Sequence, residues 1–575
     1  MSSSTLKSSR IASLDQFRGY TVAGMFLVNF LGGFTYCPEV LKHSHIYLSY
    51  ADTIMPHFLF AVGFAFRLTF GRRSSSEGMW PAYRRVLTRF LGLMLVAIVV
   101  YGAGREAQTW DDLKHLGFWG ALYTPFKREW FQTLMHIAVT AVWITPVIRS
   151  SISVRVIYLI FSGVLHIALS HLFNFEWCST SPNVIDGGPI GILTWAIPML
   201  LGTLVCDAVA GATGRPNLVK MFTWSIVVMA IGWMMSCGTR LYDMTDSEMA
   251  DMRARADLQG KERAAFNKPI EPLAKQRAEL YKQILGLTEQ LEGRLQVDPV
   301  EDPQERKELI KKKEELIKQD HEIRAQIDEL KKEFVAYRDG TEPFVVQRMN
   351  LQAKIAAIDN KLNGTPTYSK VVDEQQRTKL TAEKDKLAAE YEAAGAEIEK
   401  IKANPPEKVE RRFREVKLAL DPVFPSQARI DALKQRFEEQ GWKALVAEPP
   451  FVYPVHDKPG ALKRSRMLRE WNYWMISQRE GTLSYTTIAG GFSIFVYAIF
   501  YIVCDIWGFQ LAFFRTFGTN ALVGYMLHGL AAGSVKTFMP RDVPGWYMWI
   551  GFFIFMWIVW LFLRTLEKNN IYVKL

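Results

Sequence analysis

The stretch IGILTWAIPMLLGTLVCDAVAG, residues 190–211, decides the fold class of this chain. It contains one charged residue, Asp207. A helix of roughly 20 apolar residues is long enough to cross the hydrocarbon core of a bilayer. Lipid offers the backbone no hydrogen-bonding partner, so a single apolar run crosses it as a helix. The stretch therefore predicts a membrane-spanning helix.

Similar apolar runs lie on both sides of it. They cover residues 17–36, 52–71, 86–104, 130–148, 153–173 and 218–238 in the first half, and 483–505, 510–534 and 545–565 at the C-terminal end. The 17 Trp and 36 Phe fall almost wholly in these regions, as is typical of lipid-facing and interfacial positions. We predict an all-α polytopic membrane protein of about ten transmembrane helices. A different count in the first half is the alternative.

Charge in the connecting loops predicts the orientation. Against one acid, Glu77, six arginines lie near the second connection: Arg67, Arg72, Arg73, Arg84, Arg85 and Arg89. The loop before residue 190 holds Glu176 and Asp186 without Lys or Arg. Short cytoplasmic loops are enriched in Lys and Arg, so both termini are expected in the cytoplasm, at the inner membrane if the source is bacterial. The same loops explain much of the net charge of +11, which therefore does not indicate nucleic-acid binding.

Residues 244–450 have a different composition, dominated by Lys, Glu, Arg, Gln and Ala. Two series of apolar residues recur every seven positions: Leu309, Leu316, Ile323 and Leu330, then Leu380, Leu387, Ala394 and Ile401. This spacing is typical of coiled coils. We predict an extracytoplasmic helical coiled-coil insertion, with a hairpin break at 339–343, between membrane domains 1–243 (seven helices) and 451–575 (three helices). It is a rigid spacer or an arm that binds an envelope protein or a second copy of the chain.

One basic cluster disagrees with this orientation. Lys463, Arg464, Arg466 and Arg469 precede the eighth run, on the side expected to be external. Long translocated segments largely escape the charge rule, so the ten-helix prediction is kept.

Polar residues around the first two runs are the main candidates for chemistry. Asn29, His43, His45 and Asp52 lie where these runs form a hairpin. A carboxylate can hold an imidazole in one tautomer and keep it basic, and an amide can donate to a developing oxyanion. The structural alternatives are solvated loop histidines and an Asp52 that only caps its helix.

Other polar residues in or beside the runs have weaker claims. Asp15 and Arg18 share a helix face at the start of the first run and can form an ion pair or an interfacial anchor. Gln132, Asn520 and His528 are candidates for substrate binding, and interhelical hydrogen bonds are the structural alternative. The same alternative applies to His136 and to Asp186, which precedes a run together with Gly187 and Gly188. The five cysteines show no CxxC spacing, and no metal site is predicted.

Two of these stretches resemble a known family. SLDQFRGYTVAGMFLVNFLGG (13–33) and YADTIMPHFLFAVGFAF (50–66) are similar to the transmembrane acetyltransferases typified by heparan-α-glucosaminide N-acetyltransferase. Weaker similarities continue through Phe131-Gln132, residues 191–202, Leu483-Ser484-Tyr485, Asn520 and His528. The resemblance covers both membrane domains and excludes the insertion.

The resemblance implies transfer of an acetyl group from cytoplasmic acetyl-CoA to an extracytoplasmic amino sugar or glycan. The catalytic histidine of the family corresponds to His43 if one gap is allowed, with His45 as the competitor, and its active-site asparagine corresponds to Asn29. Asp52 would support the histidine as general base. The loop LKHSHIYLSYAD (41–52) lacks the tryptophan usual in the family, so the acceptor is open.

The donor would be held at the cytoplasmic rim. Asp15 and Arg18, with Arg67, Arg72 and Arg73, are the candidates, the last three for the phosphates of CoA. Their structural alternative is that they only fix the topology.

Two other functions fit the apolar runs. One is a transporter or flippase of a glycan or lipid, and the other is a structural membrane protein that presents a coiled coil. The insertion offers no nucleophile or metal cluster, so we expect that a Gly/Ser linker in place of residues 250–450 leaves the chemical step intact.

Overall fold

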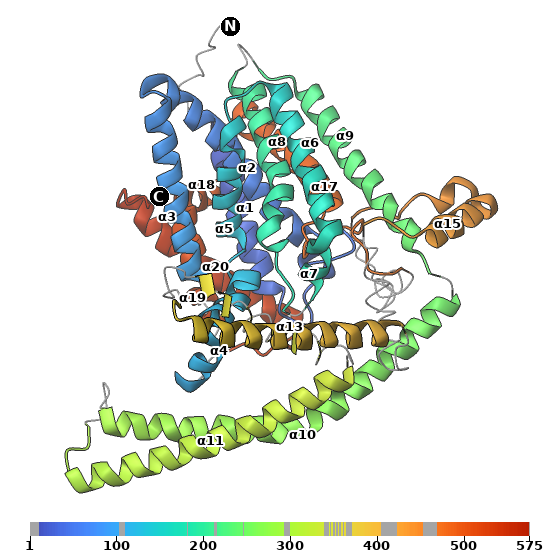
Figure 1. Cartoon of the computed structure of the whole chain (residues 1–575). Coiled ribbons are helices and arrows are strands. Elements are labelled where there is room, and N and C mark those ends of the chain that lie inside the picture. The colour runs from blue at the N-terminus through green and yellow to red at the C-terminus, as the bar shows by residue number, and fades with distance from the viewer. Residues whose placement is uncertain are drawn as a thin grey trace. The chain divides into compact units, whose positions relative to one another are not determined.

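The computed structural model of the chain describes residues 11–573, except 103–109, 181, 212–214, 245, 293–298, scattered positions from 339 to 370, 404–422 and 452–468. It forms two compact units (Figure 1). Residues 1–246 and 421–575 make up the membrane unit, and residues 247–420 make up the arm.

The membrane unit is helical. Its helices are α1 (Ala12–Leu31), α2 (Tyr50–Ser76), α3 (Met79–Tyr101), α4 (Trp110–Thr124), α5 (Thr133–Ile144), α6 (Ile152–Leu169), α7 (Phe175–Ser179), α8 (Ile192–Ala210), α9 (Leu218–Ser236), α15 (Gln427–Gln440), α17 (Leu483–Tyr501), α18 (Ala512–Thr519), α19 (Ala521–Lys536) and α20 (Gly545–Lys568). A helix lies at each of the predicted apolar runs.

Six helical segments in the described part of the chain are long and apolar enough to cross a membrane. They are Tyr50–Ser76, Ile152–Ser179, Gly188–Ala210, Leu218–Tyr242, Leu483–Ile506 and Gly545–Lys568, and Thr133–Val147 is a shorter apolar helix. The chain is therefore an integral membrane protein, while the count of ten spans stays a prediction.

The ninth predicted run, 510–534, is wrong as a single helix. The structure breaks it at Asn520, whose backbone is non-helical (φ −121°, ψ 44°), into α18 and α19. The buried Asn520 side chain instead binds the C-terminal tail: its amide donates to the carbonyl of Ile571 at 3.0 Å and its oxygen accepts from the N–H of Val573 at 3.1 Å. Hydropathy does not register such a break.

Helices α2 and α8 pack backbone to backbone in the core of the membrane unit. A Cβ atom on Gly202 would lie 2.1 Å from the carbonyl oxygen of Phe60, and one on Gly63 would lie 1.9 Å from that of Met199. Small residues allow membrane helices to approach closely. This contact fixes α2, whose N-terminal end carries the candidate site.

The segment that follows the arm also belongs to the membrane unit. Arg469 forms ion pairs with Asp243 and Glu448, and Arg436 of α15 pairs with Asp243 at 2.6 Å. The positive charge of Arg469, which disagreed with the predicted orientation, is therefore neutralised locally. Lys463, Arg464 and Arg466 lie outside the described residues.

The arm contains long helices, α10 (Asp246–Glu292), α11 (Pro303–Arg338) and α13 (Glu374–Ala403). Helices α10 and α11 run side by side (Figure 1), joined by an apolar cluster that includes Leu280, Leu287, Leu316 and Ile323. Arg277 and Asp320 add an ion pair at 2.8 Å. The first heptad series therefore faces α10. The predicted break at 339–343 lies outside the described residues.

Candidate active site

The N-terminus of α2 shapes the loop that carries His43. Ser49 is the N-cap: its hydroxyl accepts from the N–H of Asp52 at 3.2 Å, and the Asp52 carboxylate accepts from the N–H of Ser49 at 3.1 Å. This reciprocal capping box fixes the start of the helix. Asp52 thus caps its helix, as the structural alternative expected, but its carboxylate has a further partner.

That partner is His43. Its Nδ1 lies 2.7 Å from Oδ1 of Asp52, while Oδ2 accepts from the N–H of Ser44 at 3.1 Å and from the Ser49 hydroxyl at 2.8 Å. The Asp52 side chain is 1% exposed and that of His43 is 49% exposed. An immobile, buried carboxylate therefore holds one imidazole nitrogen, and the half-exposed ring keeps the other for a reactant.

A second carboxylate, Asp186, acts on the same imidazole. Burial lowers the pKa of His43, but the hydrogen bond and charge of Asp52 and the charge of Asp186 outweigh it and raise that pKa above its ordinary value. Burial in turn raises the pKa of Asp186 to about 7, against the opposing effects of His43 and Gln478. Two acids therefore surround one basic group.

The loop around Asp186 is held in an unusual conformation. Asp186 has a positive φ of 56°, its carbonyl accepts from the indole of Trp195 at 2.7 Å, and its carboxylate accepts from the amide of Gln478. The N–H of Gly187 donates to the carbonyl of Arg479 at 2.8 Å. Strained backbone in a buried, well-determined loop is typical of functional sites.

Tyrosines surround these acids. The hydroxyl of Tyr485 on α17 donates to the backbone carbonyl of Asp52 at 2.7 Å. The hydroxyls of Tyr101 on α3 and Tyr525 on α19 lie 2.6 Å apart, and both are within electrostatic range of Asp186. Segments from both ends of the chain thus converge on the His43 loop.

The segment after the arm also touches this loop. The N–H of Leu48 donates to the carbonyl of Pro450 at 2.7 Å, and Leu48 pairs with Phe451 as an isolated parallel bridge. The ring of His45 lies edge-on to Trp471, with centroids 6.4 Å apart. His45 therefore packs against this segment, whereas His43 faces Asp52.

The remaining candidates near the first two helices lie apart from this pair. The side chain of Asn29 is exposed, and its backbone carbonyl accepts from Lys536 at 3.2 Å. Among the described residues, no hydrogen bond joins Asn29 to His43. Its proposed role at the oxyanion stays a prediction.

Two of the distal candidates make local contacts. The Gln132 amide donates to the carbonyl of Glu129 at 2.9 Å, just before α5. His528 lies by the carbonyl of Tyr525 and stacks on Phe26, with centroids 5.5 Å apart. These contacts, like those of Asn520 with the C-terminal tail, are of the kind that the structural alternative expects, and a role of these residues in substrate binding stays a prediction.

A basic pocket lies where α2 meets α3. It has a volume of about 660 Å³ and its walls include Arg73, Arg84, Arg85, Arg89 and Trp80. Arg85 pairs with the one acid of the pocket, Glu77, at 2.8 Å. Arg18 and Arg73 are within electrostatic range of Arg89. Such a concentration of guanidinium groups suits a phosphate-bearing ligand.

Of the other residues predicted to bind the acyl donor, Arg67 does not line the basic pocket. Its guanidinium binds Asp207 of α8 at 2.8 Å and the carbonyl of Ile148. The fully buried Arg155 shares the same carboxylate and donates to Thr203 at 2.8 Å. Arg67 is thus part of an internal network, while Arg72 is exposed and Asp15 lies at the start of α1.

Some residues around the site carry only weak signals in the sequence. Asp186, beside Gly187 and Gly188, stood out only as a polar group before a span, and Tyr485 lay in a weak motif. Nothing in the spacing linked Tyr101 to Tyr525, more than 400 positions apart. Asp207 is the one charged residue of the apolar run 190–211, which is a signal for an internal ion pair.

One comparison with known families covers the first part of the membrane unit. Residues 10–232 match the family model described as heparan-alpha-glucosaminide N-acetyltransferase, catalytic. The match includes His43, Asp52 and Asp186 and ends before the arm. No curated protein matches the chain. Within the described residues, no group of three or more His, Cys, Asp or Glu side chains could hold a metal ion.

Proposed function

Through residues 10–232 the chain belongs to the transmembrane acyltransferase family of heparan-α-glucosaminide N-acetyltransferase, and from that membership we propose that it transfers an acetyl group from cytoplasmic acetyl-CoA to an extracytoplasmic amino sugar. The observation that carries the proposal is the contact of 2.7 Å between the half-exposed His43 and the buried Asp52. Acyl transfer in the membrane, without its donor and acceptor, follows from the family.

His43 is the general base in this proposal. With Nδ1–H donated to Asp52, the Nε2 lone pair is left to accept a proton. The carboxylate is fixed by three further donors, Ser44 N–H, Ser49 N–H and the Ser49 hydroxyl, so it holds the ring without rearranging. The neighbouring charge of Asp186 favours the imidazolium that forms.

The reaction then balances as a direct transfer. The amine nitrogen of the sugar attacks the thioester carbon, and its proton passes to Nε2 of His43. The carbon–sulfur bond breaks, the amide forms, and the thiolate of CoA takes the proton from the imidazolium. No metal or redox partner is needed for this balance.

The basic pocket is the proposed site for the donor's phosphates. Arg73, Arg84 and Arg89 offer charge and bidentate hydrogen bonds, and Trp80, 75% exposed, offers a face for the adenine ring. Arg67 is not included, because Asp207 already neutralises it.

The test uses the full-length protein purified in detergent. We expect it to convert acetyl-CoA and glucosamine into free CoA and N-acetylglucosamine, measured by thiol release and mass spectrometry. The His43→Ala variant gives the background rate. Wild-type rates equal to that background, with a folded monodisperse protein, would contradict the proposal and favour a transporter or a structural role.

A further inference from the structure

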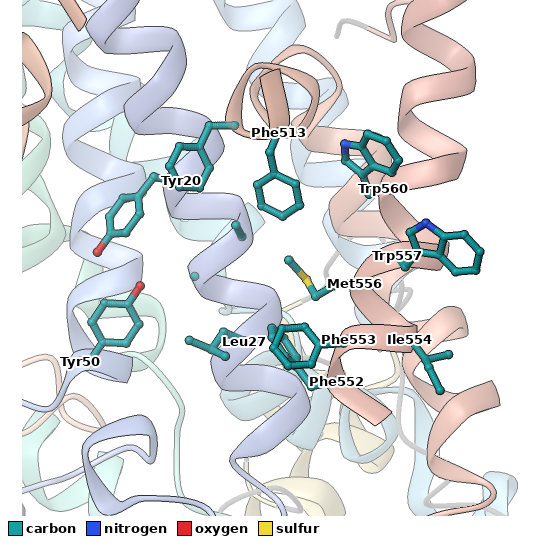
Figure 2. Close-up of a pocket in the computed structure, with 13 residues that line it drawn as sticks. Tyr20, Leu27, Tyr50, Phe513, Phe552, Phe553, Ile554, Met556, Trp557 and Trp560 are labelled. Carbon is teal, nitrogen blue, oxygen red and sulfur yellow. The ribbon is translucent and has the colours of Figure 1, made fainter. Parts of the chain in front are cut away.

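A second cavity opens on the side of the membrane unit. It is a groove of about 870 Å³ between α1, α18 and α20, and it reaches the first residue of α2 (Figure 2). Its walls include Tyr20, Leu27, Phe513, Phe553 and Trp557. The last two are 62% and 61% exposed on an apolar helix, so the groove opens where lipid would lie.

Polar atoms are few in this groove. The phenols of Tyr20 and Tyr50 face one another in Figure 2, and the other lining residues are Ala, Gly, Leu, Phe, Ile, Met and Trp. The groove therefore offers mainly carbon surface along its length and suits a hydrocarbon chain. A phosphorylated or strongly hydrated ligand would find no charged partner among these lining residues.

The groove is separate from the basic pocket. Helical residues advance by about 100° each, so Arg18 and Tyr20 point about 200° apart on α1. Tyr20 and Leu27, seven residues apart, share the groove face, while Arg18 is within electrostatic range of Arg89 in the basic pocket. The two cavities share no lining residue, so the proposed site for the donor's phosphates is not in the groove.

One end of the groove adjoins the candidate active site. Tyr50 lines it and directly follows Ser49, whose hydroxyl donates to the carboxylate that holds His43. A chain lying in the groove would therefore bring whatever it carries to the base of the His43 loop.

We propose that the acceptor is membrane-anchored, with the hydrocarbon tail of a lipid-linked amino sugar in this groove and its sugar at His43. This inference rests on the proposed acetyl transfer and names its acceptor class. A tail in the bilayer is already out of water, so the groove contributes orientation more than transfer energy. Orientation of a reactant lowers the barrier by fixing the attacking atom near its target.

The first test compares two acceptors that share one head group. Protein in lipid nanodiscs receives methyl or dodecyl 2-amino-2-deoxyglucoside, and we expect kcat/KM to be about 100-fold higher for the dodecyl compound. Leu27→Trp fills the groove and should reduce this ratio to about tenfold or less. Ile558→Trp adds the same bulk at a lipid-facing position of α20 outside the groove and should leave the ratio unchanged. If Leu27→Trp does not insert, Ala23→Leu replaces it.

The second test does not depend on catalysis. A dodecyl glucosaminide with a diazirine in its tail is photolysed with the His43→Ala protein, and peptides carrying Phe553 or Trp557 should be labelled. Equal rates on both acceptors, a ratio that survives Leu27→Trp, or labelling confined to other helices would each overturn the proposal. Labelling of the groove without any acetyl transfer by the wild type would support the tail site and contradict the proposed function.

Discussion

Leu48 and Pro450 are joined by a backbone hydrogen bond of 2.7 Å, so the loop that carries His43 is paired with the chain that follows the arm. The arm as a structural unit therefore ends at residue 420, whereas the charged composition continues to residue 450. Residues 421–450 share the charged character of the arm but pack with the membrane unit.

This pairing gives a prediction for two matched deletions. A Gly/Ser linker in place of residues 247–420 should leave acetyl-CoA turnover within about twofold of wild type, because the arm is a compact unit of its own. A linker in place of 247–450 removes the partner of Leu48 and should reduce turnover by about 100-fold, the scale of loss caused by misplacing a catalytic group by about 1 Å. Initial rates of thiol release on monodisperse protein measure both.

Loss of activity in both deletions would mean that the arm completes the active site. Near-wild-type activity of both deletions would show that the Leu48 contact does not position His43. In either case the original expectation, that all of 250–450 is dispensable for the chemical step, is tested directly by the longer deletion.

The two histidines of the loop should behave differently. His43→Ala should lower kcat by about 10²–10⁴-fold, the usual contribution of a general base. His45→Ala removes a ring that packs on Trp471 and should retain kcat within about tenfold of wild type, a change of about 1.4 kcal/mol in the barrier. Elution profile and yield in detergent are the controls. An active His43→Ala with an inactive His45→Ala would assign the family histidine to position 45.

The pH dependence of kcat/KM should reveal the effect of the Asp186 charge on His43. A general base works when deprotonated, so the rising limb of log kcat/KM follows the pKa of His43. The charge of Asp186 raises that pKa, so Asp186→Asn should lower it and move the rising limb to lower pH. Asparagine tolerates the positive φ at this position, which favours folding of the variant.

Glu480→Gln is the matched control for this shift. Glu480 is buried in the adjoining loop, where burial also raises its pKa, but its partners are Ser477 and Ser179 and it does not act on His43. Its replacement should change the stability of the protein and leave the rising limb of the pH profile in place. An unmoved limb in Asp186→Asn, or an equal shift in both variants, would contradict the electrostatic role of Asp186.

The predictable part of the fold is the part set by local composition. Apolar runs such as 190–211 place a helix at each expected position, since lipid forces helical hydrogen bonding on any such run. The break at Asn520 could not be predicted, because it depends on a C-terminal tail that supplies Ile571 and Val573 as partners. The pairing of α11 with α10 likewise depends on which apolar face is nearest, and heptad spacing does not specify it.

The candidate site also has a part that could be predicted from the sequence and a part that could not. His43 and Asp52 are nine residues apart and could be proposed from a hairpin alone. Asp186, by contrast, acts on His43 through the tertiary fold, and its carboxylate is held by Gln478, which lies 292 positions further along the chain. A single sequence carries no signal for such a contact.

The arginines of the basic pocket should affect binding of the donor. Arg73→Gln, Arg84→Gln and Arg89→Gln should each raise KM for acetyl-CoA by about tenfold, the loss of one charge-assisted hydrogen bond of about 1.5 kcal/mol, with little change in kcat. Added salt should raise the wild-type KM as well, since the pocket is exposed. Steady-state kinetics at two ionic strengths measure both effects, and an unchanged KM in all three variants would place the phosphates elsewhere.

The Asp207 network should affect stability. Its carboxylate forms ion pairs with both Arg67 and the fully buried Arg155, so Asp207→Asn leaves these two guanidinium groups without that opposing charge. Removing one partner of a buried ion pair costs about 3–5 kcal/mol. Glu77→Gln removes a partner of the exposed Arg85 and should cost no more than about 1 kcal/mol, so it is the matched control.

Thermal unfolding in detergent can be followed with a thiol-reactive dye, because Cys37, Cys178, Cys206 and Cys504 are buried until the unit opens. We expect Asp207→Asn to unfold well below wild type and Glu77→Gln to unfold close to it. Equal unfolding temperatures for the two variants would mean that Asp207 does not stabilise the core, and Arg67 would again be a candidate for binding the donor.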